Sequence, residues 1–232
     1  MPQSGGPAAY AGRGVHAVAV EALAKRIFNG TYGVGDTVDL RGLMAELDVS
    51  QTVLREAIKV LTTKGLLDAR QKRGTFVRPQ EQWNLLDSDV LRWKLAAGAS
   101  PGFFAELLAL RRSIEPAAAA LAAQHRTEDD LGSLDAALSA MAATDSDPVL
   151  LVRADASFHT ALLAASHNRF YAQMYRVIVP VLIQRDRTVH AGAFEHPHPS
   201  HAEVVESIRS RDAEGASLSM HALLDMSGRD HP

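Results

Sequence analysis

No cysteine occurs in this 232-residue chain, which excludes disulfide bonds and metal sites built from thiolates. No apolar run approaches the roughly 20 residues that a transmembrane helix needs, and the N-terminus lacks the apolar core of a signal peptide. Hydrophobic residues make up 47% of the chain and charged residues 22%, as in ordinary globular proteins. We therefore expect a cytoplasmic protein of one or two domains that has no membrane partner.

The chain also has no excess of basic residues, and its formal net charge is −3. This charge at first argues against a nucleic-acid partner. The charges are unevenly distributed, however. Residues 12–80 hold 11 lysines and arginines against 7 aspartates and glutamates, whereas residues 81–232 hold 13 against 20. Nine of the ten histidines also follow residue 80. This asymmetry predicts a basic N-terminal part that meets phosphates and an acidic, histidine-rich part with another role.

The segment 41–64 predicts two short helices joined by a tight turn. Apolar residues at helical spacing give each helix one inward face, and Ser50 is a natural N-cap for the second helix. Polar side chains lie off the apolar stripe at the start of that second helix. This pattern is typical of a helix-turn-helix, whose second helix enters the major groove of DNA. The alternative is a solvated surface helix in any α-helical protein.

A β-hairpin with a basic tip is expected directly after these helices, with strands at 66–70 and 75–78. Another short strand is expected before them, at 37–40. A hairpin that follows a helix-turn-helix makes a winged helix, and its basic tip can meet phosphates or the minor groove. The alternative is a solvated turn. The candidate DNA-binding residues of the hairpin are Arg70, Lys72, Arg73 and Gly74.

The sequence after residue 80 predicts helices separated by polar loops, and no strands. Two helices open with a cap residue followed by proline, at Ser100 and Asp147, and Ser200 has the spacing of a capping box with Glu203. Six or seven such helices predict an all-α bundle, so the fold class is mainly α. The expected organisation is a disordered tail at 1–12, a winged-helix domain at 13–80, a linker and linker helix at 81–99, and a helical ligand-binding and dimerisation domain at 100–228.

Four polar side chains on apolar helix faces mark a candidate site in the bundle. Asp155 and His159 lie four residues apart on one face, while Arg111 and His201 share faces with apolar residues elsewhere. A carboxylate that faces a core is costly unless it is paired or bound to a metal. We therefore expect these four residues to form a polar pocket for an anionic effector. The alternatives are structural ion pairs, including one between Arg111 and Glu115, and satisfied core histidines.

An aspartate and a histidine at i and i+4, together with a distant histidine, are a donor set suited to a divalent ion such as Zn²⁺. Asp155, His159 and His201 are therefore candidate metal ligands as well. A metal-dependent hydrolase that uses these three residues is the alternative function, although no nucleophile motif or phosphate loop accompanies them. A bundle that only dimerises and bridges partners would leave the inward Asp155 unexplained.

The segment 34–79 resembles the DNA-binding domain of the GntR family of bacterial transcription regulators, through LREA at 54–57, KGL at 64–66 and RGTFV at 73–77. The resemblance implies DNA contacts at the wing and at four further residues, Arg41, Ser50, Thr52 and Arg55. Gln51 stands where many members carry arginine. Because glutamine prefers adenine where arginine prefers guanine, we expect Gln51 to read DNA and the operator to differ from the common half-site of the family.

The second part resembles the FCD ligand-binding domain of the FadR subfamily, through LRRSIEP at 110–116, DASFH at 155–159 and AASHN at 164–168. Residues 82–93 further resemble regulators of galactonate and related sugar-acid catabolism. The resemblances imply a homodimeric repressor that binds an inverted repeat and is released by a sugar acid, an aldonate such as galactonate or gluconate. The family often has a histidine on the last helix as a fourth metal ligand, and here that position falls on Leu223.

Overall fold

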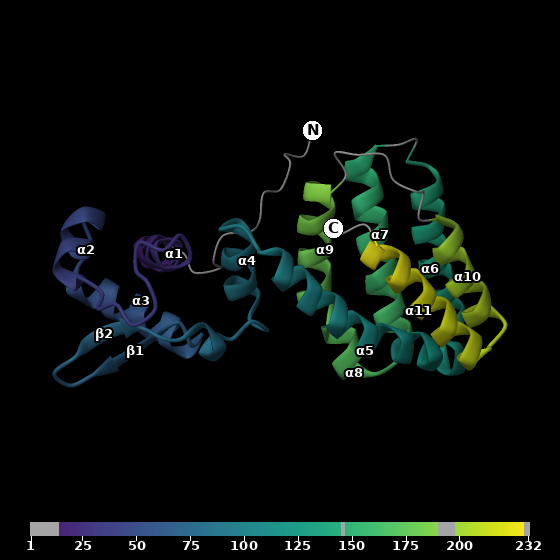
Figure 1. The fold of residues 1–232 in the computed structure, drawn as a ribbon, viewed down its shortest axis with the longest axis horizontal. Coiled ribbons are helices and arrows are strands. Elements are labelled where there is room, and N and C mark those ends of the chain that lie inside the picture. The colour runs from purple at the N-terminus through teal and green to yellow at the C-terminus, as the bar shows by residue number, and fades with distance from the viewer. Residues whose placement is uncertain (1–13, 145–146, 190–197, 230–232) are drawn as a thin grey trace. The chain divides into compact units, whose positions relative to one another are not determined.

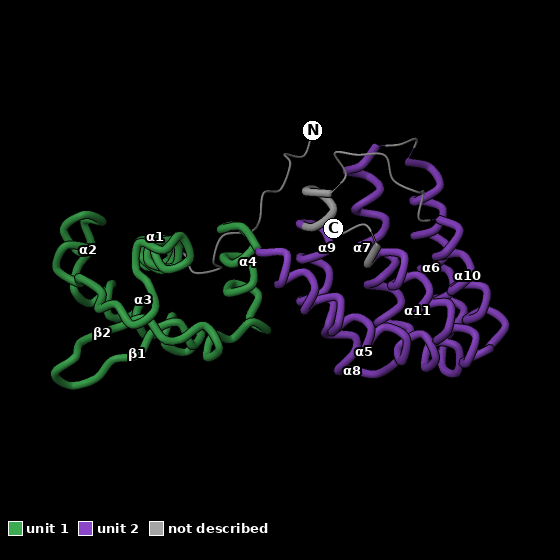
Figure 2. The backbone as a smooth tube through the Cα atoms, viewed as in Figure 1, with its two compact units in different colours: residues 1–99 green, residues 100–232 purple. Residues whose placement is uncertain are grey.

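A computed structural model describes residues 14–144, 147–189 and 198–229. The tail expected at 1–12 lies outside these described residues. The chain forms two compact units, residues 1–99 and residues 100–232 (Figure 2). Each unit has its own buried apolar core, so each is described by itself.

The first unit contains a helix-turn-helix and a two-stranded wing (Figure 1). Its elements in chain order are α1 (Val15–Phe28), α2 (Leu40–Leu47), α3 (Gln51–Thr63), β1 (Leu67–Arg70), β2 (Gly74–Val77), the 3-10 turn η1 (Gln80–Gln82) and α4 (Ser88–Ala96). The hairpin strands pair antiparallel, with Leu67 opposite Val77 and Arg70 opposite Gly74. Gly74 has a φ of 80°, which favours glycine at the end of the turn. The winged helix expected from the sequence is confirmed.

Local capping fixes where the two helices of the helix-turn-helix begin. The Asp39 side chain accepts hydrogen bonds from the backbone N–H groups of Arg41 and Gly42, at 3.1 and 3.0 Å. The Ser50 hydroxyl accepts one from the N–H of Val53 at 3.3 Å, as an N-cap does. The strand expected at 37–40 is wrong, because the Asp39 cap starts α2 there and leaves only an isolated bridge between Thr37 and Phe76.

The linker helix α4 is bound to the first unit by ion pairs. Asp87 caps α4 by accepting from the N–H groups of its first turn, and Lys64 at the end of α3 lies 2.8 Å from Asp87 and 2.9 Å from Asp89. Trp93 is buried and donates from Nε1 to a carboxylate oxygen of Glu21 on α1 at 2.8 Å. The segment expected as a linker at 81–99 is therefore packed within the first unit.

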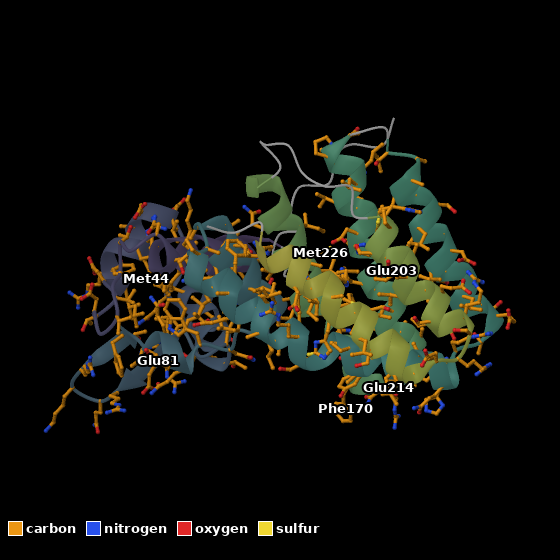
Figure 3. All side chains as sticks on the ribbon, turned by 45° about the vertical axis from the view of Figure 1, so that its right-hand side comes forward. Met44, Glu81, Phe170, Glu203, Glu214 and Met226 are labelled. Atoms are coloured by element: carbon orange, nitrogen blue, oxygen red, sulfur yellow. The ribbon has the colours of Figure 1, made fainter. Side chains whose placement is uncertain are left out.

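The second unit is a bundle of helices around one apolar core (Figure 1). Its helices are α5 (Pro101–His125), α6 (Glu128–Ala142), α7 (Pro148–Ala165), α8 (Arg169–Gln173), α9 (Tyr175–Val189), α10 (His198–Arg209) and α11 (Ala213–Arg229). The core joins residues of α5, α6, α7, α10 and α11, while charged side chains such as Glu203 and Glu214 lie on the exposed surface (Figure 3).

The helix starts in this unit match the sequence analysis in two cases out of three. Ser100 and Asp147 cap α5 and α7, each followed by a proline in the first turn. The capping box expected at Ser200 is wrong, because α10 already begins at His198 and Ser200 lies inside its first turn. Among the described residues, no helix is long and apolar enough to cross a membrane.

Candidate DNA interface and buried polar cluster

The residues expected to read DNA bases lie on the exposed N-terminal end of α3. Ser50, Gln51, Thr52 and Arg55 are all exposed there, and Arg41 is exposed in the first turn of α2. The opposite face of α3 carries Leu54, Ala57, Ile58 and Leu61 into the core of the first unit. Because the apolar face fixes the helix and the polar end remains accessible, α3 has the form of a recognition helix.

The four wing residues are exposed, but their surroundings differ. Arg73 is folded back, since its Nη2 donates to the carbonyl oxygen of Gly35 at 3.1 Å and its guanidinium lies 3.8 Å from the centre of the Phe76 ring. Arg70 lies 3.4 Å from Asp68 in an exposed ion pair. Lys72 sits at the tip of the hairpin with a φ of 74°. Arg73 therefore braces the wing, while Lys72 offers its charge at the tip.

Five polar side chains meet inside the bundle, and we call them the polar cluster. Arg111 and Glu115 come from α5, Asp155 and His159 from α7, and His201 from α10. The side chain of Asp155 is 14% exposed, whereas the other four residues are buried. The structure thus brings together the four residues proposed from the sequence. Asp155 is therefore the member of the polar cluster that is most exposed to solvent.

Arg111 and Glu115 form a buried ion pair one helical turn apart. Arg111 Nε donates to Glu115 Oε1 at 2.9 Å, and Nη2 lies 3.4 Å from Oε2. The same Nη2 lies 3.0 Å from His159 Nε2. On the other side of the imidazole, His159 Nδ1 lies 2.9 Å from Glu115 Oε2. The pair of α5 therefore contacts both ring nitrogens of His159.

Asp155 connects the two histidines. Its Oδ1 lies 3.0 Å from His201 Nε2 and 3.6 Å from His159 Nε2. The Phe158 ring meets both imidazoles edge to face, with centroids 5.3 Å from His159 and 4.5 Å from His201. An apolar ring thus packs against both histidines, while one carboxylate lies close to both of them.

The charges of the polar cluster stabilise one another against burial. Burial raises the pKa of Glu115, but Arg111 and His159 outweigh it and lower that pKa to about 2. Burial likewise raises the pKa of Asp155, yet His159 and His201 hold it well below its usual value. Burial lowers the pKa of His159, but the carboxylates of Glu115 and Asp155 raise it to about 8. Both carboxylates are therefore ionised at neutral pH.

Glu115 is expected from the sequence only as a structural partner of Arg111, whereas in the structure it also faces His159. The i, i+4 spacing of Arg111 and Glu115 was the available signal, because it places both side chains on one helix face. The position of His159 beside this pair was not visible in the sequence, since the two segments are joined only by tertiary packing.

Three residues of the polar cluster fit a divalent metal ion. One donor atom from each of Asp155, His159 and His201 lies within 4.8 Å of the others. Leu223, the position at which the resemblance implies a fourth ligand, is buried in the apolar core, and His221 is exposed. The residues present thus offer two nitrogens and one oxygen, which leaves coordination positions open.

Two family models match the chain, one for each unit. The model of bacterial regulatory proteins of the gntR family matches residues 16–77, and the FCD domain model matches residues 106–226. These ranges contain α3 and the wing in the first unit and all five residues of the polar cluster in the second. Both matches support a transcription regulator, and they give no support to the hydrolase considered as the alternative.

Curated relatives match most of the chain. The galactonate operon transcriptional repressor of Escherichia coli K12 is 33% identical over 209 residues, which cover 86% of this chain and 90% of that protein. The transcriptional regulator LutR of Bacillus subtilis 168 is 31% identical over 162 residues, 69% of this chain and 72% of that protein.

Solved structures share the fold at lower identity. A GntR protein of Streptococcus agalactiae superposes with a TM-score of 0.52 at 24% identity and covers 92% of this chain and 99% of its own. Lar, which controls the expression of the Listeria monocytogenes agr system, superposes with a TM-score of 0.63 at 17% identity, covering 95% and 98%. The chain belongs to the gntR family of bacterial regulatory proteins, as a DNA-binding transcription regulator with an FCD domain.

Proposed function

We propose that this regulator represses genes of sugar-acid catabolism and that an aldonate such as galactonate or gluconate releases it from DNA. The observation that carries the proposal is a buried cluster of one guanidinium, two carboxylates and two imidazoles inside the FCD domain. Such a cluster offers a cation for a carboxylate and several partners for hydroxyl groups. The 33% identical relative, a galactonate operon repressor, supports this choice of effector.

On the DNA side, one winged helix would cover one half-site, and a homodimer would match the two-fold symmetry of an inverted repeat. Arg55 and Gln51 would read base edges, while Arg41, Ser50 and Thr52 would bind phosphates or bases beside them. Lys72 at the wing tip would add a phosphate or minor-groove contact. These residues are exposed on the elements that the family uses for DNA. Because bacterial DNA lies in the cytoplasm, we propose that the protein acts there.

On the effector side, Arg111 would take the carboxylate of the acid as a bidentate fork. Asp155, His159 and His201 would take hydroxyl groups, directly or through a metal ion. Because Arg111 is already paired with Glu115 in a buried site, the acid has to compete with that pair. An acid that replaces this pair binds the two conformations of the protein with different affinities, and this difference shifts the equilibrium between them.

The metal ion, where one is bound, would be held by Asp155, His159 and His201, which have a donor set suited to Zn²⁺ or a similar ion. Its chemistry would be that of a Lewis acid, which attracts the carboxylate or hydroxyl oxygens of the effector. Glu115 would orient His159 from the other ring nitrogen, as carboxylates do for metal-binding histidines.

The experiment is a gel shift with the DNA upstream of the protein's own gene, with galactonate, gluconate and, as a neutral control, galactose. Release by an aldonate but not by galactose is the expected result. The Arg111→Lys variant keeps the charge but loses the fork, so it should bind DNA and respond weakly. Arg112→Lys is the matched control, because Arg112 is partly exposed and pairs with Asp225. DNA binding that no aldonate changes, or an Arg111→Lys variant that responds like wild type, contradicts the proposal.

A further inference from the structure

The nitrogen of His159 that a metal ion would need is already in contact with Arg111. His159 Nε2 lies 3.0 Å from Arg111 Nη2. A guanidinium group only donates hydrogen bonds and carries a full positive charge, so it occupies the side of Nε2 from which a metal ion would bind. While Arg111 stays where it is, this nitrogen is not open to an incoming ion.

The rest of the cluster makes this a choice between two cations. Asp155 Oδ1 lies 3.6 Å from the same His159 Nε2 and 3.0 Å from His201 Nε2. An ion bound to these three residues would therefore sit beside the guanidinium in a buried region, where like charges repel strongly. We infer that Arg111 and a divalent metal ion are alternative partners of His159 Nε2, so that Arg111 excludes the ion from the protein without effector.

Arg111 is kept in this position by its own ion pair. Glu115 is fully buried and contacts the guanidinium at 2.9 and 3.4 Å. Removing Arg111 from the pair would leave a buried carboxylate with less compensation, which is strongly unfavourable. Leu223 is apolar and has no donor atom. It therefore cannot provide the ion with a fourth ligand that would offset this loss. The balance therefore favours the guanidinium.

An effector carboxylate would change this balance. A carboxylate that takes Arg111 as its partner draws the guanidinium away from His159 Nε2 and frees the lone pair for the ion. Effector and metal would then bind cooperatively, and the coupling would be reciprocal. This consequence alone rests on the proposed function, whereas exclusion of the ion by Arg111 is tested on the protein without DNA or effector.

The test compares Zn²⁺ binding by wild type, Glu115→Gln and the double variant Arg111→Met/Glu115→Gln, each stripped with chelator and titrated against a chromogenic zinc indicator. The double variant removes both charges of the buried pair and the guanidinium group that contacts His159. It should bind Zn²⁺ tighter than wild type by about tenfold or more, because the repulsion is gone. Glu115→Gln retains Arg111, because the glutamine amide oxygen can still accept its hydrogen bond, but it loses the carboxylate that would orient His159. The zinc affinity of this variant should therefore not rise above that of wild type. Leu223→His adds a ligand but leaves Arg111, so its gain should be smaller than that of the double variant.

Equal affinities of wild type and the double variant would overturn the inference, and so would an equal rise in Glu115→Gln. Where the double variant does not fold, the wild type decides. Histidine ¹⁵N spectra of wild type with stoichiometric Zn²⁺ should show no metal-bound shift for His159, and a metal-bound His159 would overturn the inference. A negative result of the zinc experiments leaves the proposed repressor function untouched, because the gel shift with aldonates tests that function separately.

Discussion

The N-terminal end of α3, with its candidate DNA-binding residues, and the polar cluster of the bundle are built in opposite ways. The candidate base-reading residues are exposed and come from one short segment, whereas the cluster residues come from three helices and four of the five are buried. Exposed residues gain their partners only when DNA arrives, so they add little to the stability of the fold. The cluster residues already contact one another, so a ligand must replace existing contacts. Specific DNA reading and effector response therefore place different demands on stability.

The largest effect is expected for a substitution in the buried polar cluster. Glu115→Ala leaves Arg111 and His159 without their carboxylate in a closed site, which should destabilise the second unit by about 3–5 kcal/mol. Urea unfolding measures the change. Asp225→Ala is the control, because Asp225 pairs with Arg112 at the surface and its loss should change stability by less than about 1 kcal/mol. Equal effects of the two substitutions would mean that burial of the Arg111–Glu115 pair contributes nothing.

At the exposed side, Arg55→Ala should leave the fold intact and weaken operator binding by about 1–3 kcal/mol, if Arg55 reads a base. The measurement is fluorescence anisotropy with operator DNA at matched salt, and circular dichroism checks that the fold is unchanged. Non-specific DNA should lose much less affinity than the operator. Unchanged operator binding would remove Arg55 from the DNA contacts.

Lys72→Ala sharpens the distinction between reading bases and binding phosphates. Because a phosphate contact is blind to sequence, binding to operator and non-specific DNA should weaken alike, and the slope of log K against log salt should fall by about 1. Anisotropy titrations over a range of salt concentrations measure both quantities. A loss confined to the operator would instead indicate base reading by the wing tip.

The smallest effect is expected at Arg73, the wing residue that is held by the fold. Arg73→Ala removes its hydrogen bond to Gly35 and its contact with the Phe76 ring, which should lower the stability of the first unit by about 1 kcal/mol. Thermal unfolding compares this variant with Lys72→Ala, which should keep the wild-type stability. Equal melting temperatures for the two variants would show that Arg73 does not brace the wing.

Local patterns in the sequence were sufficient for most of the first unit. The Ser50 cap, the turn before it and the glycine at the hairpin predicted α3 and the wing, because caps and tight turns depend on a few neighbouring residues. The same reasoning failed at 37–40, where a strand pattern competed with the Asp39 cap, and at Ser200, where α10 starts earlier. Competing local signals set the ends of helices and strands, so the sequence pattern alone determines these ends least well.

The sequence by itself determined which residues of the bundle face inward, because helical periodicity places Arg111, Asp155, His159 and His201 on apolar faces. Only the tertiary structure decided how they pair. Periodicity cannot tell that Arg111 bonds to Glu115 rather than Asp155, nor that the guanidinium reaches His159 Nε2. Those contacts depend on the packing of α5, α7 and α10, which are separated along the chain by long stretches of helix. The apolar spacing that buries each side chain carries no information about its partner on another helix.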